Sequence, residues 1–321
     1  MLCNLIIDGN YILSRLVFTL HKNNLLFGAL EQSLENSINN YRKWYPFKKI
    51  YLVSDSKEKS WRKNLTKNYK SNRKKDSDID WGFVYETYGH FKESTNSSIT
   101  VLESPNVEGD DWISYICHVS NKDGVSNIII SNDYDIKQLL RYSLDPLCIN
   151  IMSNEMYNKT KLFMPENYKL FLNKVNSLPN DDIFNLNDNK DFLLLIDSFL
   201  NRYDINEVNY IESLVVKLIS GDKSDNISSI WTQPNGRGIG EKGAQNIYKK
   251  YLNEFGDVDL KDEDLYENIA DLVCESKKLS RSKMNKIVSN IKHNSKLIDL
   301  RINNIPKDIR DKMSEVYNNS I

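Results

Sequence analysis

Four short apolar runs rich in β-branched residues alternate with longer amphipathic stretches, and this alternation limits the possible folds more than any other feature. The runs lie at 5–7, 49–54, 99–102 and 127–131, and a helical stretch from 11 to about 45 follows the first. Short runs of this kind are typical of buried strands, and strands that alternate with helices indicate βαβ units. We therefore expect an α/β fold with a mainly parallel sheet that is covered by helices on both faces.

Aspartates follow three of these runs within a few residues. Asp8 follows the first run, Asp55 the second, and Asp133 and Asp135 the fourth. Because parallel strands end at the same edge of a sheet, where α/β proteins bind their ligands, we expect these four side chains to be neighbours.

The stretch 107–135 carries the densest group of acidic side chains. Three of them open a predicted helix and two follow the fourth strand: Glu108, Asp110, Asp111, Asp133 and Asp135. Crowded carboxylates repel each other unless a cation lies among them, which favours a divalent metal site. Taken alone, the first group is also explained by a helix N-terminus and the second by a turn. Their convergence with the aspartates after the first two strands favours the metal site.

A basic segment, residues 56–75, begins directly after Asp55. It contains nine basic residues against the single acid Glu58: Lys57, Lys59, Arg62, Lys63, Lys67, Lys70, Arg73, Lys74 and Lys75. Such a run is often only a solvated helix face, but its start at the predicted crevice favours contacts with a phosphate backbone. The net charge of −1 therefore hides an acidic site next to a basic segment, which suits a polyanionic substrate.

Two further motifs follow a predicted apolar helix at 211–219. Asp222 and Asp225 lie three residues apart and would face one way on a helical turn, although a polar helix end also explains them. Ten residues on, Gly236, Gly238 and Gly240 precede another predicted helix. Closely spaced glycines at a helix N-terminus either bind phosphate or simply connect two helices. Their spacing is not that of a dinucleotide-binding loop.

Composition narrows the class of protein. The length of 321 residues suggests about two domains. No apolar run is long enough to span a membrane, and the amino terminus lacks the features of a signal peptide. The four cysteines lack metal-site spacing and the histidines do not cluster, so we expect reduced thiols, no zinc site and a cytoplasmic location.

Six motifs in this order resemble those of the 5′ nuclease superfamily of flap endonucleases and 5′-to-3′ exonucleases, most closely its branch of T-even bacteriophage ribonuclease H enzymes. The motifs are Ile7-Asp8-Gly9-Asn10, the basic pattern from Trp61-Arg62 to Tyr69-Lys70-Ser71-Asn72-Arg73 after Asp55, Glu108-Gly109-Asp110-Asp111, Ser131-Asn132-Asp133-Tyr134-Asp135, Gly221-Asp222-Lys223-Ser224-Asp225-Asn226, and the glycine-rich stretch 236–244. The resemblance spans most of the chain. Two parts of the chain depart from the pattern: the region from about 161 to 210 is longer than in the phage enzymes, and the arch sequence matches only at Arg62, Tyr69, Lys70 and Arg73.

The resemblance implies hydrolysis of phosphodiester bonds by two Mg²⁺ ions about 4 Å apart, with Mn²⁺ able to substitute. The ions would activate a water molecule and stabilise the leaving oxygen. Lys70 and Arg73 would neutralise the scissile phosphate. The implied metal ligands are nine carboxylates: Asp8, Asp55, Glu108, Asp110, Asp111, Asp133, Asp135, Asp222 and Asp225.

The resemblance also implies nucleic-acid contacts outside the metal site. The glycine-rich stretch would belong to a helix-three-turn-helix motif at about 235–252 that grips duplex DNA, with a K⁺ ion at the loop from Gly236 to Gly240. The substrates would be branched or nicked duplexes and RNA–DNA hybrids with 5′ ends. The implied contact residues are Arg62, Tyr69, Lys74, Lys75, Gly236, Gly238, Gly240 and Lys242.

On this basis the sequence predicts a catalytic domain at 1–209, with a basic helical arch at about 56–95, and a helical DNA-binding domain at 210–321. The expected function is removal of RNA primers or 5′ flaps during viral-type DNA replication, alongside a replication clamp or single-strand-binding protein. Two alternatives are a non-catalytic branched-DNA-binding protein of this fold and an RNA-directed ribonuclease of the PIN fold. The full set of carboxylates disfavours the first alternative, and the length and glycine-rich stretch disfavour the second.

Overall fold

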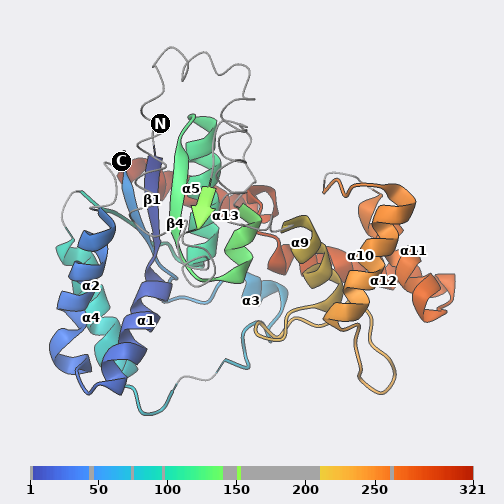
Figure 1. Ribbon diagram of the computed structural model, residues 1–321, viewed down its shortest axis with the longest axis horizontal. Coiled ribbons are helices and arrows are strands. Elements are labelled where there is room, and N and C mark those ends of the chain that lie inside the picture. Colours follow the sequence, from blue (N-terminus) through green and yellow to red (C-terminus); the bar gives the residue numbers. More distant parts are fainter. Residues whose placement is uncertain are drawn as a thin grey trace, which may run out of the picture. The chain divides into compact units, whose positions relative to one another are not determined.

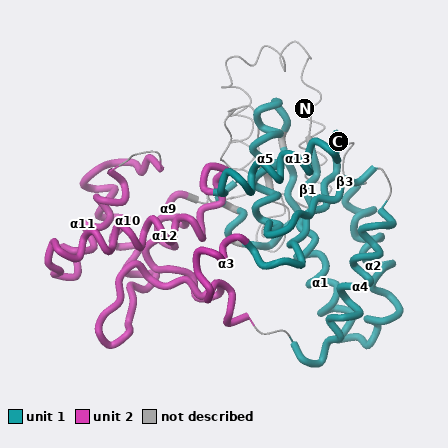
Figure 2. Tube along the Cα trace, turned by 180° about the vertical axis from the view of Figure 1, so that it is seen from behind, with its two compact units in different colours: residues 1–60, 76–207, 305–321 teal, residues 61–75, 208–304 magenta. Residues whose placement is uncertain are grey.

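The computed structural model describes residues 3–42, 47–73, 76–95, 98–139, 150–152, 210–260 and 264–320. The chain forms two compact units, which Figure 2 colours separately. Unit 1 comprises 1–60, 76–207 and 305–321, and unit 2 comprises 61–75 and 208–304. The units thus interleave along the chain, whereas the sequence predicts two consecutive domains. The predicted boundary at 209 lies outside the described residues.

Unit 1 is built on a five-stranded, all-parallel sheet in the order β3-β2-β1-β4-β5. The strands are β1 (Cys3–Asp8), β2 (Ile50–Val53), β3 (Thr100–Leu102), β4 (Ser126–Ile130) and β5 (Asn150–Met152). The first four coincide with the predicted runs, and β5 is an addition to them. The order runs outward from β1 in both directions, so the edge between β1 and β4 is a topological switch point, where ligands bind in such sheets.

Three helices cover one face of the sheet: α1 (Gly9–Lys22), α2 (Leu26–Arg42) and α4 (Trp81–Ser94) (Figure 1). Their apolar sides form one core with Leu5 and Ile7 of β1. The predicted helical stretch at 11–45 is therefore two helices. The chain turns between them at Asn24, which has a φ of 57° in the left-handed region that asparagine tolerates.

The opposite face packs against α5 (Gly109–Lys122) and α13 (Lys307–Ser320). Trp112 and Ile116 of α5 are fully buried. Tyr317 of α13 hydrogen-bonds Tyr51 of β2, hydroxyl to hydroxyl, at 3.0 Å. The predicted α/β fold with helices on both faces of a parallel sheet is confirmed, and the last helix of the chain belongs to it.

Unit 2 is helical. It contains α3 (Arg62–Leu65), α9 (Tyr210–Ser220), α10 (Glu241–Phe255), α11 (Leu265–Lys277) and α12 (Met284–Ile298). Its core includes Val215, Ile247, Ile269 and Ile291, one from each of the four longer helices. The predicted arch at 56–95 divides between the units, because α4 packs on the sheet while 61–75 joins unit 2. Among the described residues, no helix is both long and apolar enough to cross a membrane.

Candidate active site

Asp8 occupies the end of the central strand β1 and is 7% exposed. It caps α1 by accepting a hydrogen bond from the Tyr11 amide at 3.0 Å, and the Ser131 hydroxyl donates to its other oxygen at 2.7 Å. Burial raises the pKa of Asp8, the two hydrogen bonds lower it, and the charges of Asp55 and Asp133 raise it, to about 6 in all. Two of the predicted neighbours of Asp8, Asp55 and Asp133, therefore act on it electrostatically.

Asp55 follows β2 and is held by the start of α5. The amide of Gly109, the first residue of α5, donates to Asp55 Oδ1 at 2.7 Å. The N-terminal amides of a helix carry a partial positive charge, which favours a carboxylate at this position. The contact joins the ends of β2 and α5, as expected for residues that meet at one edge of a parallel sheet.

The three acidic residues at the start of α5 differ in burial, since Glu108 and Asp111 are buried and Asp110 is not. Glu108 is 6% exposed and immediately precedes the helix. Asp111 is fully buried, and it accepts a hydrogen bond from the Glu108 amide at 3.2 Å as part of a capping box. Asp110 lies between them and is partly exposed. The structure thus gives Asp111 a capping contact, and its role as a metal ligand stays a prediction.

The loop after β4 presents Asp133, which is exposed, and Asp135. The Asp133 amide donates to Ser131 Oγ at 3.1 Å, and the Asp135 amide donates to Asp133 Oδ1 at 2.8 Å. Ser131 is fully buried and connects this loop to Asp8. Sequence reasoning gave this serine no role, although its place at the end of a strand, two residues before an aspartate, was a usable signal.

The chemistry of this edge fits divalent cations. The candidate donors in unit 1 are all carboxylate oxygens, which Mg²⁺ and Mn²⁺ prefer over nitrogen or sulfur. A cation would relieve the repulsion that raises the pKa of Asp8. Within the described ranges, no three His, Cys, Asp or Glu side chains converge closely enough to hold an ion by themselves. Water or a substrate phosphate would have to complete the coordination, as is usual for Mg²⁺.

Asp222 and Asp225 belong to unit 2, where both have cationic partners. Lys217 Nζ donates to Asp222 at 2.8 Å. Burial acts to raise the pKa of Asp222, but the hydrogen bonds from Lys217 and Ser224 bring it down to about 2. Asp225 forms an ion pair with Arg73. Their predicted role as metal ligands stays a prediction.

The basic segment is anchored within unit 2 by some of the residues predicted to bind nucleic acid. Arg62 is 1% exposed, and its Nε donates to the Leu297 carbonyl at 3.1 Å. Tyr69 is 3% exposed, and its hydroxyl donates to Asp225 at 3.3 Å. These two side chains hold the segment in place and do not face solvent. Lys70 is more exposed, and its amide donates to the Asp225 carbonyl at 2.9 Å. Lys74 and Lys75 lie outside the described residues.

The glycine-rich loop lies between α9 and α10 and ends at the start of α10. Gly236 has a φ of 83°, and a Cβ at Gly238 would lie 2.8 Å from Ser229 Cβ, so loop geometry requires both glycines. Gly240 is the N-cap of α10, and Lys242 is exposed in its first turn. A helix N-terminus with a lysine in its first turn favours anions.

Comparison with known proteins gives consistent relatives. Residues 4–169 match the family of the 5′-3′ exonuclease, N-terminal resolvase-like domain. A 5′-3′ exonuclease of Buchnera aphidicola is 29% identical over 166 residues, which cover 49% of this chain and 55% of the relative. One from Mycoplasmopsis pulmonis is 25% identical over 251 residues, covering 78% and 66%. The chain thus spans about half the length of the first relative and two thirds of the second.

Solved structures with a similar fold align with nearly the full length of the chain. The T5 5′-exonuclease with bound zinc has a TM-score of 0.57 at 16% identity and covers 98% of both chains. The bacteriophage T5 D15 flap endonuclease, in a complex with DNA and metal ions, has a TM-score of 0.57 at 17% identity, again covering 98% of both. At this identity the likeness concerns the fold. Together with the family match over more than half of its residues, it shows that this chain belongs to the 5′-3′ exonuclease family.

Proposed function

We propose that this chain is a divalent-metal-dependent 5′ nuclease that hydrolyses phosphodiester bonds at the 5′ ends of branched or nicked duplexes. The observation that carries the proposal is the buried Asp8 at the switch point of the sheet, whose pKa is raised by burial and, to a smaller extent, by the charges of Asp55 and Asp133. A site of concentrated negative charge cannot approach a phosphodiester without cations. The related exonucleases named above support the same chemistry.

The carboxylates of unit 1 are the proposed ligands of two Mg²⁺ ions, with Mn²⁺ able to substitute. When bound, such ions supply an activated water and stabilise the leaving oxygen. The protein's own contribution is to hold the carboxylates in place before the substrate arrives. Ser131 and Tyr11 fix Asp8, and Gly109 fixes Asp55. The proposed set is Asp8, Asp55, Glu108, Asp110, Asp133 and Asp135.

Further expectations belong to the same proposal. Lys70 and Arg73 would neutralise the scissile phosphate, and the glycine-rich loop would bind duplex DNA, with K⁺ at Gly236 to Gly240. RNA primers and 5′ flaps would be substrates in viral-type replication in the cytoplasm, in company with a clamp or single-strand-binding protein. These expectations rest on the resemblance to flap endonucleases.

A panel of 5′-labelled substrates tests the proposal. Purified protein with Mg²⁺ should release short 5′ fragments from flap, nicked and RNA-primed duplexes, and EDTA should abolish the release. Blunt duplex with a blocked 5′ end is the control. A protein that binds flap DNA but cleaves none of the panel with either Mg²⁺ or Mn²⁺ would instead be a non-catalytic branched-DNA-binding protein. Cleavage of RNA alone would indicate a ribonuclease.

The duplex-binding role of the glycine-rich loop predicts a change in salt dependence. Lys242→Gln should weaken duplex binding about threefold to tenfold and reduce the slope of log K against log salt by about one. The matched control is Lys249→Gln, an exposed lysine later on the same helix. The measurement is fluorescence anisotropy of labelled duplex from 50 to 200 mM salt, roughly the range over which such slopes are resolved. Equal slopes for wild type and Lys242→Gln would remove the loop from the duplex interface.

A further inference from the structure

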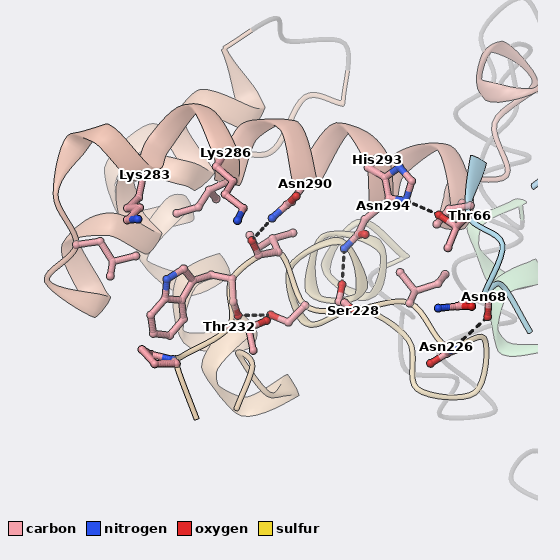
Figure 3. A pocket seen from close by; sticks show the side chains of 18 residues that line it. Thr66, Asn68, Asn226, Ser228, Thr232, Lys283, Lys286, Asn290, His293 and Asn294 are labelled. Atoms are coloured by element: carbon pink, nitrogen blue, oxygen red, sulfur yellow. Dashed lines mark hydrogen bonds between the residues drawn. The ribbon is translucent and has the colours of Figure 1, made fainter. Parts of the chain in front are cut away.

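Unit 2 contains a pocket of about 640 Å³ that none of the roles above uses. It has three walls: the basic segment at Thr66 and Asn68, the loop 226–234 that follows α9, and one side of α12 (Figure 3). The walls are tied together, because His293 of α12 hydrogen-bonds Thr66 at 2.7 Å and Asn226 donates to the Asn68 carbonyl at 2.9 Å. The pocket is therefore part of the packed structure of unit 2.

One end of the pocket is cationic. Lys283 and Lys286 lie together there, at the start of α12 (Figure 3). Within the described part of the chain neither lysine has an ion-pair partner, and no acidic side chain lines the pocket. Two like charges three residues apart at a helix N-terminus oppose both each other and the helix dipole. An anion at this end would relieve both repulsions.

The other end of the pocket offers hydrogen-bonding side chains. Asn68, Asn226 and His293 gather there, away from the two lysines (Figure 3). The Asn226 side-chain amide donates hydrogen bonds to the Asn68 carbonyl and the Ser71 hydroxyl. Its carbonyl oxygen can therefore accept a hydrogen bond from a donor on a ligand. Amides and imidazoles suit the mixed donors and acceptors on the edge of a nucleobase.

Apolar side chains form a further part of the pocket lining. Trp231 lines the pocket together with aliphatic side chains such as Ile287 and Leu279. An indole provides a flat face on which any base can stack, independently of its sequence. The pocket thus combines an anion site, an apolar wall with an aromatic ring, and a polar end. Its volume falls in the range of small-molecule sites and is too small for a base-paired duplex.

We propose that this pocket binds one unpaired nucleotide, with its phosphate at Lys283 and Lys286 and its base toward Asn68 and Asn226. The nucleotide could be free or the end of a nucleic-acid strand, since both present the same phosphate, sugar and base. The site lies wholly within unit 2 and uses none of the proposed metal ligands. The nucleotide-binding proposal can therefore be tested independently of the proposed nuclease activity.

Titration calorimetry on the full chain in EDTA, which prevents cleavage, tests the site. The ligands are thymidine 5′-monophosphate, thymidine, inorganic phosphate and a short 5′-phosphorylated oligothymidylate. We expect the monophosphate to bind at least about tenfold more tightly than thymidine or phosphate, because only it engages both ends. Phosphate binding as tightly as the monophosphate would overturn the nucleotide assignment, as would no binding of any ligand. Equal or tighter binding of the oligonucleotide identifies a strand end as the source, and preference for the monophosphate identifies the free nucleotide.

Charge variants on one helix locate the binding site. Lys283→Gln with Lys286→Gln should weaken monophosphate binding about tenfold or more. The matched control removes two other exposed charges of α12 outside the pocket, Lys292→Gln with Lys296→Gln, and should leave affinity unchanged. All four side chains are exposed, so thermal melting should report intact folding. If both double variants lost affinity equally, the lysines would act only through general electrostatic attraction, and the proposed site would be wrong.

A third variant tests the base end. Asn68→Ala removes an exposed side chain whose backbone carbonyl, the acceptor for Asn226, remains. It should weaken binding of the monophosphate several-fold while leaving that of inorganic phosphate unchanged. If both ligands lose affinity equally, the base is not recognised at this end.

Discussion

Replacing Asp133 by asparagine is expected to reduce Mg²⁺-dependent cleavage of a 5′-labelled flap substrate by about a thousandfold or more, equivalent to roughly 4 kcal/mol of transition-state stabilisation. The side chain is exposed, and its Oδ1 accepts a hydrogen bond from the Asp135 amide. Asparagine keeps that acceptor oxygen and the loop geometry. The substitution therefore removes one negative charge beside Asp8 and little else.

The comparison that isolates this charge is Asp123→Asn. Asp123 is the C-cap of α5, the helix whose first turn carries Asp110, so it lies about 20 Å along the axis from the carboxylate site. This control should cleave at the wild-type rate, and both variants should bind flap DNA with unchanged affinity in EDTA. If Asp133→Asn turned over substrate normally, the carboxylate edge would not be the metal site.

Lys70→Ala is expected to lower the single-turnover rate about a hundredfold while changing the dissociation constant of flap DNA less than about threefold. A charge that stabilises the transition state but not the ground state has this signature. The substitution is structurally mild, because the backbone of Lys70 is anchored through its amide to the Asp225 carbonyl at 2.9 Å. Alanine would meet the same left-handed φ of 54° that the lysine already adopts.

Lys67→Ala provides the matched control, since it removes the same charge from an exposed position in the same segment. It should weaken binding slightly and leave the single-turnover rate intact. If Lys70→Ala lowered only the affinity for flap DNA, Lys70 would be a contact to the phosphate backbone of the substrate, as is expected of Lys67. Quench-flow rates at saturating enzyme and anisotropy titrations separate the two quantities.

The sheet could be read from the sequence because a parallel strand buried on both faces leaves a local mark. Each of the first four strands contains a short apolar run, and all four lie where predicted. The strand β5 (Asn150–Met152) was not predicted, although β3 at the opposite edge of the sheet is equally short and was predicted. The place of α13 could not be predicted either, because its partners, Tyr51 among them, lie more than 200 residues away in the chain.

The candidate site was likewise predictable only in part from the sequence. Strand ends are set by local pattern, so the neighbourhood of Asp8, Asp55 and Asp133 was predictable. The contacts that orient these side chains are tertiary, and the serine hydroxyl that holds Asp8 was therefore missed. The basic segment shows the limit of charge counting. Nothing local separates the buried guanidinium of Arg62 from the exposed lysines around it.

The interleaved path of the chain has a consequence for the order of synthesis. Unit 1 gains α13 only after all of unit 2 has been translated, and until then the side of β2 and β3 that α13 covers lacks its partner. During that interval the Tyr51 hydroxyl lacks its hydrogen bond to Tyr317. A chain stalled on the ribosome before residue 305 should therefore contain an incomplete first unit, although the sequence of the second unit has already been translated. Folding of the sheet of unit 1 would then be a late event, completed when α13 packs against β2 and β3.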